Sequence, residues 1–267
     1  MRLKDKIIIV TGSTTGIGKA IAKRCVAEGA KVIIHGLEQE LGEAVVKEIG
    51  SDKATLLIDD LSNEGAAQHL VDFTMKTYGR LNVIVNNAAM IPSSDIHSTD
   101  MNFFRKVLEV NTIAPFALIK SALPFLSESH GCVLNIGSVN AYSGEPNLLP
   151  YSVSKGALMT MTRNLGDTLH RENSVRVNQI NPGWVLTERE IQRKREQGLP
   201  DDWYKQIPSV FAPAGRILFP EEIAAAAVYW LADESGPISG QVVDLEQHPF
   251  IGRNPPKDIT TIPSKKS

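Results

Sequence analysis

Short apolar runs rich in β-branched residues alternate along this chain with longer stretches in which apolar residues recur every three or four positions. The short runs predict strands, and the longer stretches predict amphipathic helices. The seven predicted strands cover 6–10, 31–34, 54–58, 81–85, 132–136, 175–180 and 241–245. The helices are expected to begin near Gly16, Glu38, Ser62, Thr99, Tyr151 and Pro220. This alternation predicts an α/β fold, with a doubly wound parallel sheet of seven strands and helices on both faces.

One long stretch, residues 187–214, interrupts the rhythm. It is charged and lies between the sixth strand and the last helix. Insertions of this kind often form lids, and a merely solvated excursion is the alternative. After Leu245 the chain is rich in Pro, Lys and Ser, so we expect a tail over about 247–267 whose end is mobile. No second core is needed, and residues 1–267 are therefore expected to form a single domain.

Composition narrows the classes of ligand. The chain of 267 residues has a formal net charge of -2 and mixes its charge signs, which disfavours nucleic acid and anionic membranes and favours a small molecule. Cys25 and Cys132 lie in apolar stretches and are too few for a disulfide framework or a cysteine-rich metal site, so we expect buried free thiols and no metal. No apolar run approaches membrane-spanning length, and the expected location is the cytoplasm.

A glycine-rich segment follows the first predicted strand and precedes the first predicted helix. It reads Thr11-Gly12-Ser13-Thr14-Thr15-Gly16-Ile17-Gly18. Glycines allow the sharp turn, and the N–H groups at a helix N-terminus bind phosphate. A glycine cluster alone usually marks an ordinary turn. Its position between a strand and a helix nevertheless favours a nucleotide-phosphate site.

Polar residues also follow the third and fourth strands. Asp60-Leu61 comes after the third strand, where a carboxylate could accept a hydrogen bond from an adenine amino group; a simple turn acid is the alternative. Asn86-Asn87-Ala88-Ala89 ends the fourth strand, where small side chains would let the backbone approach a ribose. Asparagine is also common at strand ends, so this second signal is ambiguous.

Four residues form a candidate device for proton transfer. Tyr151 and Lys155 are spaced to share one helix face, and a nearby ammonium favours a phenolate by lowering the phenol pKa. Tyr151 could then exchange a proton with a substrate oxygen. Ser138 follows the fifth strand and would hydrogen-bond that oxygen as well. Pro115 lacks the N–H that would bond the carbonyl of Asn111, which leaves that carbonyl free. An Asn that merely tolerates a proline kink is the alternative.

These motifs together resemble those of the short-chain dehydrogenase/reductase family, in its short single-domain branch. The glycine segment matches TGxxxGxG, residues 86–88 match NNA, and Pro182-Gly183-Trp184-Val185-Leu186-Thr187 matches the PG segment. The resemblance runs from about Leu3 to Leu245 and implies a Rossmann-like fold that binds NAD or NADP. It implies an enzyme that interconverts a secondary alcohol and a ketone, with Tyr151 as general acid/base.

The resemblance also assigns roles to individual positions. The catalytic residues would be Asn111, Ser138, Tyr151 and Lys155, with the Asn111 carbonyl holding a water that leads toward Lys155. Lys155 would also hold the nicotinamide ribose, and Thr187 would meet the carboxamide. An oxidised nicotinamide would, like the ammonium, favour the Tyr151 phenolate. It implies a homotetramer or homodimer through the helices that begin near Thr99 and Tyr151. The residues expected to bind the cofactor are Gly12, Thr14, Thr15, Gly16, Ile17, Gly18, Gly36, Leu37, Asp60, Leu61, Asn87, Ala88, Tyr151, Lys155, Pro182, Gly183, Val185 and Thr187.

The chain departs from the family pattern in three places. After the second strand it reads His35-Gly36-Leu37-Glu38, with neither the acid typical of NAD binding nor the Arg typical of NADP binding at the expected position. The nearby acids Glu38 and Glu40 favour NAD, although Thr14, Thr15 or His35 could still hydrogen-bond a phosphate. Ala89 replaces a usual glycine, and Glu246-Gln247 replaces a glycine pair, so the C-terminal segment is expected to pack on a neighbouring subunit or to remain surface tail.

The residues expected around the substrate are mostly polar. They are Ser138, Asn140, Tyr142, Glu145, Asn147, Tyr151 and Trp184. Because each buried hydroxyl needs a hydrogen-bond partner, this set favours a sugar or polyol over a steroid or acyl chain. Glu145 as a water-facing loop acid and Trp184 as lid packing are the alternatives. A lyase or epimerase of the same fold, and a nucleotide-sensing protein without catalysis, remain the competing functions.

Overall fold

The seven strands in the described part of the chain form one parallel sheet. The computed structural model describes residues 1–249 and 251, and its strand order is β3-β2-β1-β4-β5-β6-β7. The order reverses between β1 and β4, so the fold is doubly wound, as predicted, and the reversal leaves a crevice at the carboxyl ends of these strands. The strands are β1 Ile7–Val10, β2 Lys31–Gly36, β3 Ala54–Ile58, β4 Val83–Asn86, β5 Cys132–Ile136, β6 Arg176–Pro182 and β7 Val242–Leu245.

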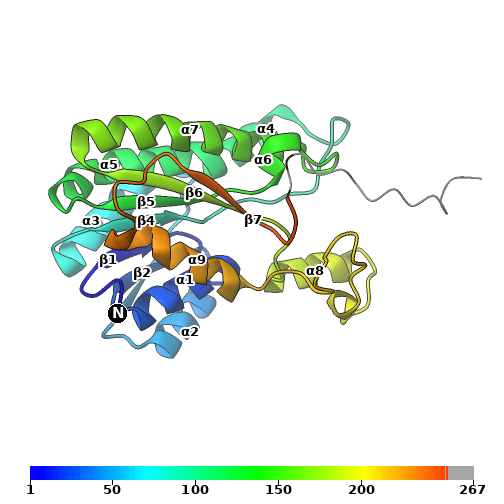
Figure 1. The fold of residues 1–267 in the computed structure, drawn as a ribbon, viewed down its shortest axis with the longest axis horizontal. Coiled ribbons are helices and arrows are strands. Elements are labelled where there is room, and N and C mark those ends of the chain that lie inside the picture. Colours follow the sequence, from blue (N-terminus) through cyan, green and yellow to red (C-terminus); the bar gives the residue numbers. More distant parts are fainter. Residues whose placement is uncertain (250, 252–267) are drawn as a thin grey trace, which may run out of the picture.

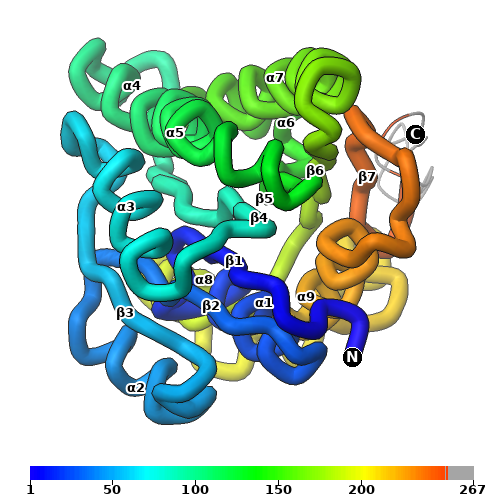
Figure 2. The backbone as a smooth tube through the Cα atoms, turned by 90° about the vertical axis from the view of Figure 1, so that its left-hand side faces the viewer, coloured from blue at the N-terminus to red at the C-terminus, as the bar shows by residue number. Residues whose placement is uncertain are grey.

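Helices cover both faces of the sheet (Figure 1). One face carries α1 (Gly16–Ala27), α2 (Gln39–Ile49) and α9 (Pro220–Leu231), and the other carries α3 (Ala66–Tyr78), α5 (Ala114–Glu128) and α7 (Leu149–Asn173) (Figure 2). Alternate strand residues point to opposite layers: Ile8 packs with α1 and α9, whereas Ile9 packs with α3 and α5. This two-sided burial explains why the strand sequences are almost continuously apolar.

The observed helix starts agree with the predicted ones at some positions and differ at others. The starts at Gly16 and Pro220 are confirmed. The helix expected near residue 99 begins one residue after Asp100, whose carboxylate accepts hydrogen bonds from the next turn and caps α4 (Met101–Leu108). The helix expected near residue 62 begins at Ala66 because residues 60–63 form a turn first. Two helices were not predicted: the short α6 (Asn140–Ser143) and α8 (Glu188–Glu196).

A π-helical turn, η1 (Glu109–Ile113), joins α4 to α5. The combined run, Met101–Glu128, is by length and composition apolar enough to cross a membrane, which the sequence analysis did not anticipate. In this fold Leu118, Ala122 and Leu126 of the run lie in the core against the sheet. A core helix meets the same criteria of length and composition, and the packing accounts for them here.

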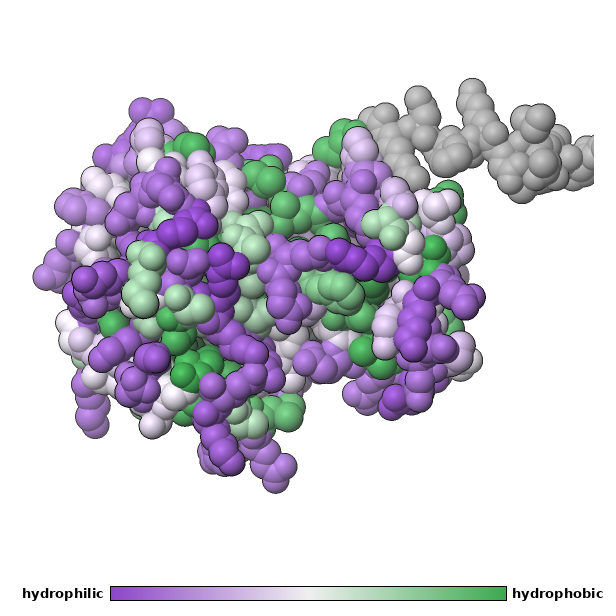
Figure 3. Space-filling view, turned by 60° about the horizontal axis from the view of Figure 1, so that its bottom comes forward, coloured by the Kyte–Doolittle hydropathy of each residue, from purple (hydrophilic) through white to green (hydrophobic). Residues whose placement is uncertain are grey.

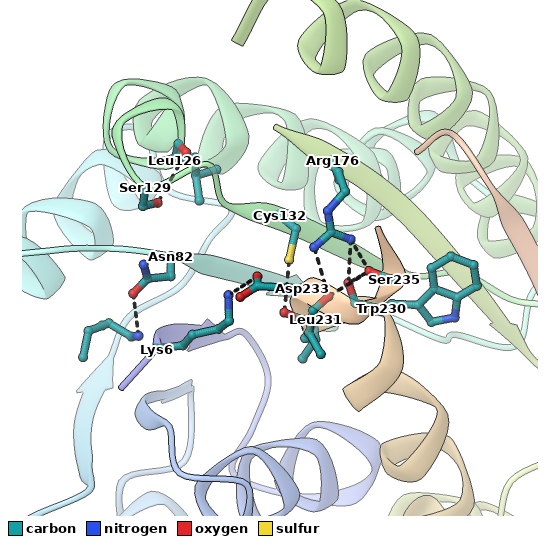
Figure 4. A network of polar contacts seen from close by, with 12 residues as sticks. Lys6, Asn82, Leu126, Ser129, Cys132, Arg176, Trp230, Leu231, Asp233 and Ser235 are labelled. Atoms are coloured by element: carbon teal, nitrogen blue, oxygen red, sulfur yellow. Dashed lines mark hydrogen bonds and ion pairs between the residues drawn. The ribbon is translucent and has the colours of Figure 1, made fainter. Parts of the chain in front are cut away.

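Polar contacts hold the amino end of the sheet together, opposite the catalytic edge (Figure 4). Lys6 Nζ lies 2.6 Å from Asp233 Oδ1. The Arg176 guanidinium donates to the carbonyls of Trp230 and Ala232, each 3.2 Å away, and so ties the end of α9 to β6. Cys132 is buried at the start of β5, and its Sγ lies 3.7 Å from the Leu231 carbonyl. These contacts fix α9 beneath the sheet and leave the carboxyl ends of the strands to form the site.

Both cysteines are free and buried, as predicted. Burial raises the pKa of the Cys25 thiol to about 12, so Cys25 stays protonated and unreactive. Within residues 1–249 and 251, no three His, Cys, Asp or Glu side chains gather closely enough to hold a metal ion.

The segment after β6 forms a small lobe of its own. It contains α8 and the 3₁₀ turn η2 (Trp203–Lys205), and it protrudes from the body, with apolar surface between the two (Figure 3). Trp203, Ile207, Ala212 and Ile217 form a separate buried cluster there. The predicted excursion is therefore a packed unit. Most of the predicted tail, residues 250 and 252–267, lies outside the described residues.

Candidate active site

The glycine segment forms a tight loop between β1 and α1. Gly12 has φ +60°, and a Cβ on it would lie 2.8 Å from Ala88 Cα. A Cβ on Gly18 would overlap the Gly12 carbonyl and the Asn87 amide. Any larger residue at these two positions would displace the loop or the neighbouring strand end. The loop thus leaves backbone N–H groups at the start of α1 accessible at close range.

Asn87 braces this loop. Its Nδ2 donates to the carbonyls of Thr11, at 2.8 Å, and Gly12, at 2.9 Å. In return, Thr11 Oγ1 accepts from the backbone N–H groups of Asn87 and Ala88, each at 3.0 Å. The predicted small residues after β4 therefore serve two purposes, because they allow close packing and also hold the loop in shape.

A carboxylate lies on the loop where a phosphate is expected. The Gly16 N–H donates to Glu188 Oε2 at 3.1 Å. A Cβ on Gly16 would also lie 3.3 Å from Cγ2 of Thr187, the residue that caps α8. The Gly16 N–H thus donates to an anionic oxygen, which is the kind of partner that a phosphate would supply. The cradle therefore fits a dinucleotide, and it brings the first residues of the lobe onto the cofactor loop.

The end of β2 presents an acid to the same loop. Thr14 Oγ1 donates to Glu38 Oε2 at 2.9 Å, and a Cβ on Gly36 would lie 2.6 Å from Thr14 Cγ2. Leu37 is exposed. His35 is buried, and burial lowers the pKa of its imidazole to about 4, so it carries no charge at neutral pH. His35 is thus a poor partner for a phosphate, contrary to one option that the sequence left open.

Asp60 forms the turn after β3. Its Oδ1 accepts from the Ser62 N–H at 2.9 Å and from the Ser62 hydroxyl at 2.8 Å. These hydrogen bonds from Ser62 hold the pKa of the Asp60 carboxyl below its usual value. The turn role is therefore present in the structure, and adenine contact by Asp60 and the buried Leu61 stays a prediction.

Tyr151 and Lys155 lie on one face of α7, next to Ser138. Tyr151 is 7 % exposed, Lys155 is 3 % exposed, and Lys155 Nζ lies 5.8 Å from the centroid of the Tyr151 ring. The ammonium donates to the Ile136 carbonyl at 2.7 Å, at the end of β5. Burial lowers the pKa of Lys155 to about 8, which still leaves it mostly protonated at pH 7.

The chain by itself does not lower the pKa of the Tyr151 phenol, and the lowering expected with an oxidised nicotinamide bound stays a prediction. Burial raises the pKa of the phenol, and this effect outweighs the lowering by the Ser138 hydrogen bond and by the positive charge of Arg193. The Lys155 ammonium donates its hydrogen bond to the Ile136 carbonyl and lies 5.8 Å from the centroid of the Tyr151 ring. Tyr151 is therefore protonated at neutral pH in this state, which suits proton donation to a ketone.

Asn111 lies in the π turn and is fully buried. Its side chain accepts from the Met90 N–H at 2.8 Å and donates to the Met90 carbonyl at 2.9 Å and to Ser154 Oγ at 2.9 Å. The Ser154 hydroxyl in turn donates to the Tyr151 carbonyl at 2.6 Å. The side chain thus fixes α7 relative to the loop after β4. The π turn ends two residues before Pro115, where the sequence predicted a break in helical hydrogen bonding.

Comparison with known proteins places this arrangement in a family. Residues 12–246 match the family model described as enoyl-(acyl carrier protein) reductase. The chain is 36% identical over 236 residues to L-fucose dehydrogenase of Bos taurus, covering 88% of this chain and 85% of that one. It is 33% identical over 238 residues to an NADP-dependent (R)-specific alcohol dehydrogenase of Lentilactobacillus kefiri, covering 88% and 92%. The chain belongs to the short-chain dehydrogenase/reductase family.

A solved structure supports the same assignment. The 3-oxoacyl-(acyl-carrier-protein) reductase of Agrobacterium tumefaciens, solved with NADP bound, superposes with a TM-score of 0.82 at 27% identity, covering 91% of this chain and 93% of that one. This short-chain dehydrogenase/reductase is accordingly an NAD(P)-dependent oxidoreductase that acts on CH–OH groups.

The lobe supplies charged residues that sequence reasoning missed. Trp184 stacks on Trp203 with ring centroids 5.2 Å apart, and its Nε1 donates to Glu190 Oε1 at 2.8 Å. Arg193 Nη2 lies 2.6 Å from Glu190 Oε2, while its Nε is buried without a partner in the described part of the chain. The i,i+3 spacing of Glu190 and Arg193 would have indicated an ion pair if the helix α8 had been predicted. These contacts show the packing of Trp184 within the lobe, and its contact with a substrate stays a prediction.

The other predicted substrate residues fall into two groups. The Asn140 N–H donates to Ser138 Oγ at 3.2 Å, so Asn140 lies beside the predicted catalytic serine. Glu145 and Asn147 are exposed, in agreement with the loop-acid alternative for Glu145. Tyr142 is directed elsewhere, because its hydroxyl donates to Asp244 Oδ1 at 3.1 Å at the end of β7. Its predicted place around the substrate is corrected on this ground.

The PG segment is shaped by an acid that replaces the usual glycine. Glu246 Oε2 accepts from the Trp184 N–H at 3.0 Å, and a Cβ on Gly183 would overlap the Glu246 carboxylate. A larger residue at position 183 would have to displace the Glu246 carboxylate. Contacts of Pro182, Gly183, Val185 and Thr187 with a nicotinamide stay predictions, as do those of Thr15 and Ile17 with the phosphates.

Proposed function

We propose that this enzyme interconverts a polar secondary alcohol, of the sugar or polyol class, and the corresponding ketone, with Tyr151 as the general acid/base. The observation that carries the proposal is the buried group of Ser138, Tyr151 and Lys155 beside a lobe whose Trp184 and Glu190 are hydrogen-bonded to each other. The first three residues support the reaction, and the last two support the class of substrate.

In the reductive direction, the protonated Tyr151 donates its proton to the substrate oxygen, which becomes a hydroxyl. Ser138 hydrogen-bonds the same oxygen in both states and so keeps it within reach of the phenol. Lys155, protonated at neutral pH, stabilises the phenolate that remains. A bound nicotinamide supplies the hydride, or accepts it in the reverse reaction, when Tyr151 takes the proton back.

The substrate class rests on the lobe. An indole face and a Glu–Arg pair can bind the apolar and hydroxyl faces of a sugar, because the carboxylate accepts and the guanidinium donates. Arg193 has a buried Nε with no partner in the described chain, which a substrate oxygen would satisfy. The named activity of the Bos taurus relative, L-fucose dehydrogenase, supports the same class.

A kinetic panel tests both parts of this proposal. The purified enzyme is assayed by nicotinamide absorbance with sugars, polyols, simple secondary alcohols and long-chain apolar ketones. We expect the highest kcat/KM for the sugars and polyols, and a preference for the apolar ketones would refute the substrate class. Tyr151→Phe should abolish turnover while cofactor still binds by calorimetry, and more than about a tenth of wild-type activity would remove Tyr151 from the mechanism.

We propose NAD as the preferred cofactor. Glu38 is hydrogen-bonded to Thr14 at the cofactor loop, where its carboxylate would repel a 2′-phosphate and accept from ribose hydroxyls. The relative from Lentilactobacillus kefiri is NADP-dependent, so both cofactors have to be tested. Parallel titrations with NAD and NADP in one buffer decide the question, and a lower dissociation constant for NADP would overturn the proposal.

We also propose that the enzyme works as a homodimer or homotetramer in the cytoplasm. Ile113, Phe116 and Val153 are exposed apolar residues on the π turn, α5 and α7, which is the surface expected to pair. The two free thiols suit a reducing compartment. Light scattering after size exclusion measures the assembly, and a monomer at assay concentration would contradict the first part.

A further inference from the structure

A chain of buried polar side chains runs beneath the active site, across β4, β5, α7 and β6. Asn86 donates to Asn135, Asn135 donates to Thr162, and Thr162 donates to Gln179, each over 2.8 Å. Gln179 Nε2 then donates to Asn181 Oδ1 at 2.7 Å. All five side chains are at most 4 % exposed. The proposed reaction uses none of them, yet burying so many amides is costly unless each is satisfied.

The chain ends on the catalytic serine. Asn181 Oδ1 accepts from the backbone N–H of Ser138 at 3.1 Å. Gly137, the preceding residue, lies directly against these amides, because a Cβ on it would overlap both Asn181 and Gln179. Asn181 Nδ2 donates to Asp244 Oδ1 at 3.0 Å, which holds the amide from its other side. The segment that carries Ser138 is thus seated on Asn181.

The serine N–H fixes the direction of every link. A backbone N–H can only donate, so Asn181 must turn its oxygen toward Ser138 and its nitrogen toward Asp244. Gln179 must then present its nitrogen to Asn181 and its oxygen to Thr162. The same reasoning passes through Asn135 to Asn86, which precedes the loop brace Asn87. A single orientation of each amide therefore connects the cofactor loop to the serine.

We propose that Asn181 is a positioning residue for the reaction: held by Gln179 and Asp244, it sets the place of Ser138 over the substrate oxygen. This inference rests on the proposed function, because it assumes that Ser138 contacts that oxygen. Displacing a reacting group by about 1 Å can cost on the order of 100-fold in rate. Loss of the Asn181 side chain should therefore lower kcat more than it changes KM or cofactor binding.

The chain provides a matched control in the same strand. Asn178 is 1 % exposed, donates to the Ile238 carbonyl at 3.0 Å and accepts from the Gln241 N–H at 3.0 Å, so it secures β7 rather than the serine. Asn181→Ala and Asn178→Ala remove equal side chains that make similar hydrogen bonds. Both should lose stability. We expect kcat to fall at least about tenfold in Asn181→Ala only, with KM and the NAD dissociation constant within about threefold of wild type.

A double-mutant cycle separates positioning from general damage. If Asn181 acts through the serine, Asn181→Ala should lower single-turnover rates by less than about threefold in a Ser138→Ala background, although it lowers them at least about tenfold in the wild type. Additive effects, or equal loss of kcat in Asn178→Ala, would overturn the inference. Should Asn181→Ala not fold, Gln179→Met leaves Asn181 present without its donor, and the same non-additivity with Ser138→Ala is required. Absence of turnover in the wild type itself would instead refute the proposed function.

Discussion

Replacing Lys155 with methionine is expected to stabilise the cofactor-free protein while abolishing its activity. The lysine is 3 % exposed, and burial lowers its pKa from 10.5 to about 8. Because the folded pKa lies below the unfolded one, the cost of burying the charge is full below about pH 8 and is relieved as the pH rises toward 10.5. A shift of this size corresponds to about 3 kcal/mol at pH 7 and about 1 kcal/mol at pH 9.5.

One opposing effect must be subtracted. The Lys155 ammonium donates to the Ile136 carbonyl at 2.7 Å, and the variant leaves that carbonyl without this donor, at a cost of about 1 kcal/mol. The free energy of unfolding of Lys155→Met should therefore exceed that of wild type by about 2 kcal/mol at pH 7. At pH 9.5 this difference should have fallen to about 0 kcal/mol.

The assay is urea unfolding followed by tryptophan fluorescence, at one protein concentration and without cofactor. Lys120→Met, at an exposed position of α5, is the control and should show the same small effect at both pH values. A stability difference between Lys155→Met and wild type that does not change with pH would refute the reasoning. It would mean that the buried ammonium does not carry the cost assigned to it.

Three further substitutions test the cofactor loop. Gly18→Ala should prevent cofactor binding in calorimetry, because its Cβ would overlap the Gly12 carbonyl; unchanged affinity would contradict this. Glu188→Gln should lower the NAD dissociation constant by about three- to tenfold, since a carboxylate that competes with phosphate for the Gly16 N–H is removed; weaker binding would oppose that view. Glu38→Gln should raise the kcat/KM ratio of NADP to NAD at least about tenfold, and an unchanged ratio would exclude Glu38 as the discriminating residue.

The sheet was predictable because each strand is short, apolar and separated from the next by a helical repeat. Strands buried on both faces need such runs, and the glycine segment marked the turn from β1 to α1. Helix ends were less readable where a side chain decides them. Asp100 caps α4 through hydrogen bonds that its sequence position allows but does not require. The polar residues 60–63 form a turn before α3 for the same reason.

The candidate site divides along a similar line. Positions close together in sequence, such as Tyr151 and Lys155, could be joined by helical spacing alone. The contacts of Glu188 with Gly16 and of Asn181 with Ser138 connect residues far apart in the chain, and nothing in the local pattern indicates them. Glu188 and Asn181 have the same side chains as many surface residues of the chain. Only their positions in the fold give them these contacts.

The pKa of the Tyr151 phenol likewise depends on contacts that the local sequence does not indicate. The sequence places an ammonium one helical turn away, which by itself would favour the phenolate. The structure shows that the ammonium is bonded to the Ile136 carbonyl, while burial of the ring opposes ionisation more strongly. A charge of the lobe, Arg193, contributes to the lowering that remains. The ionisation of Tyr151 thus depends in part on Arg193, which lies in a segment that the sequence indicated only as a charged interruption.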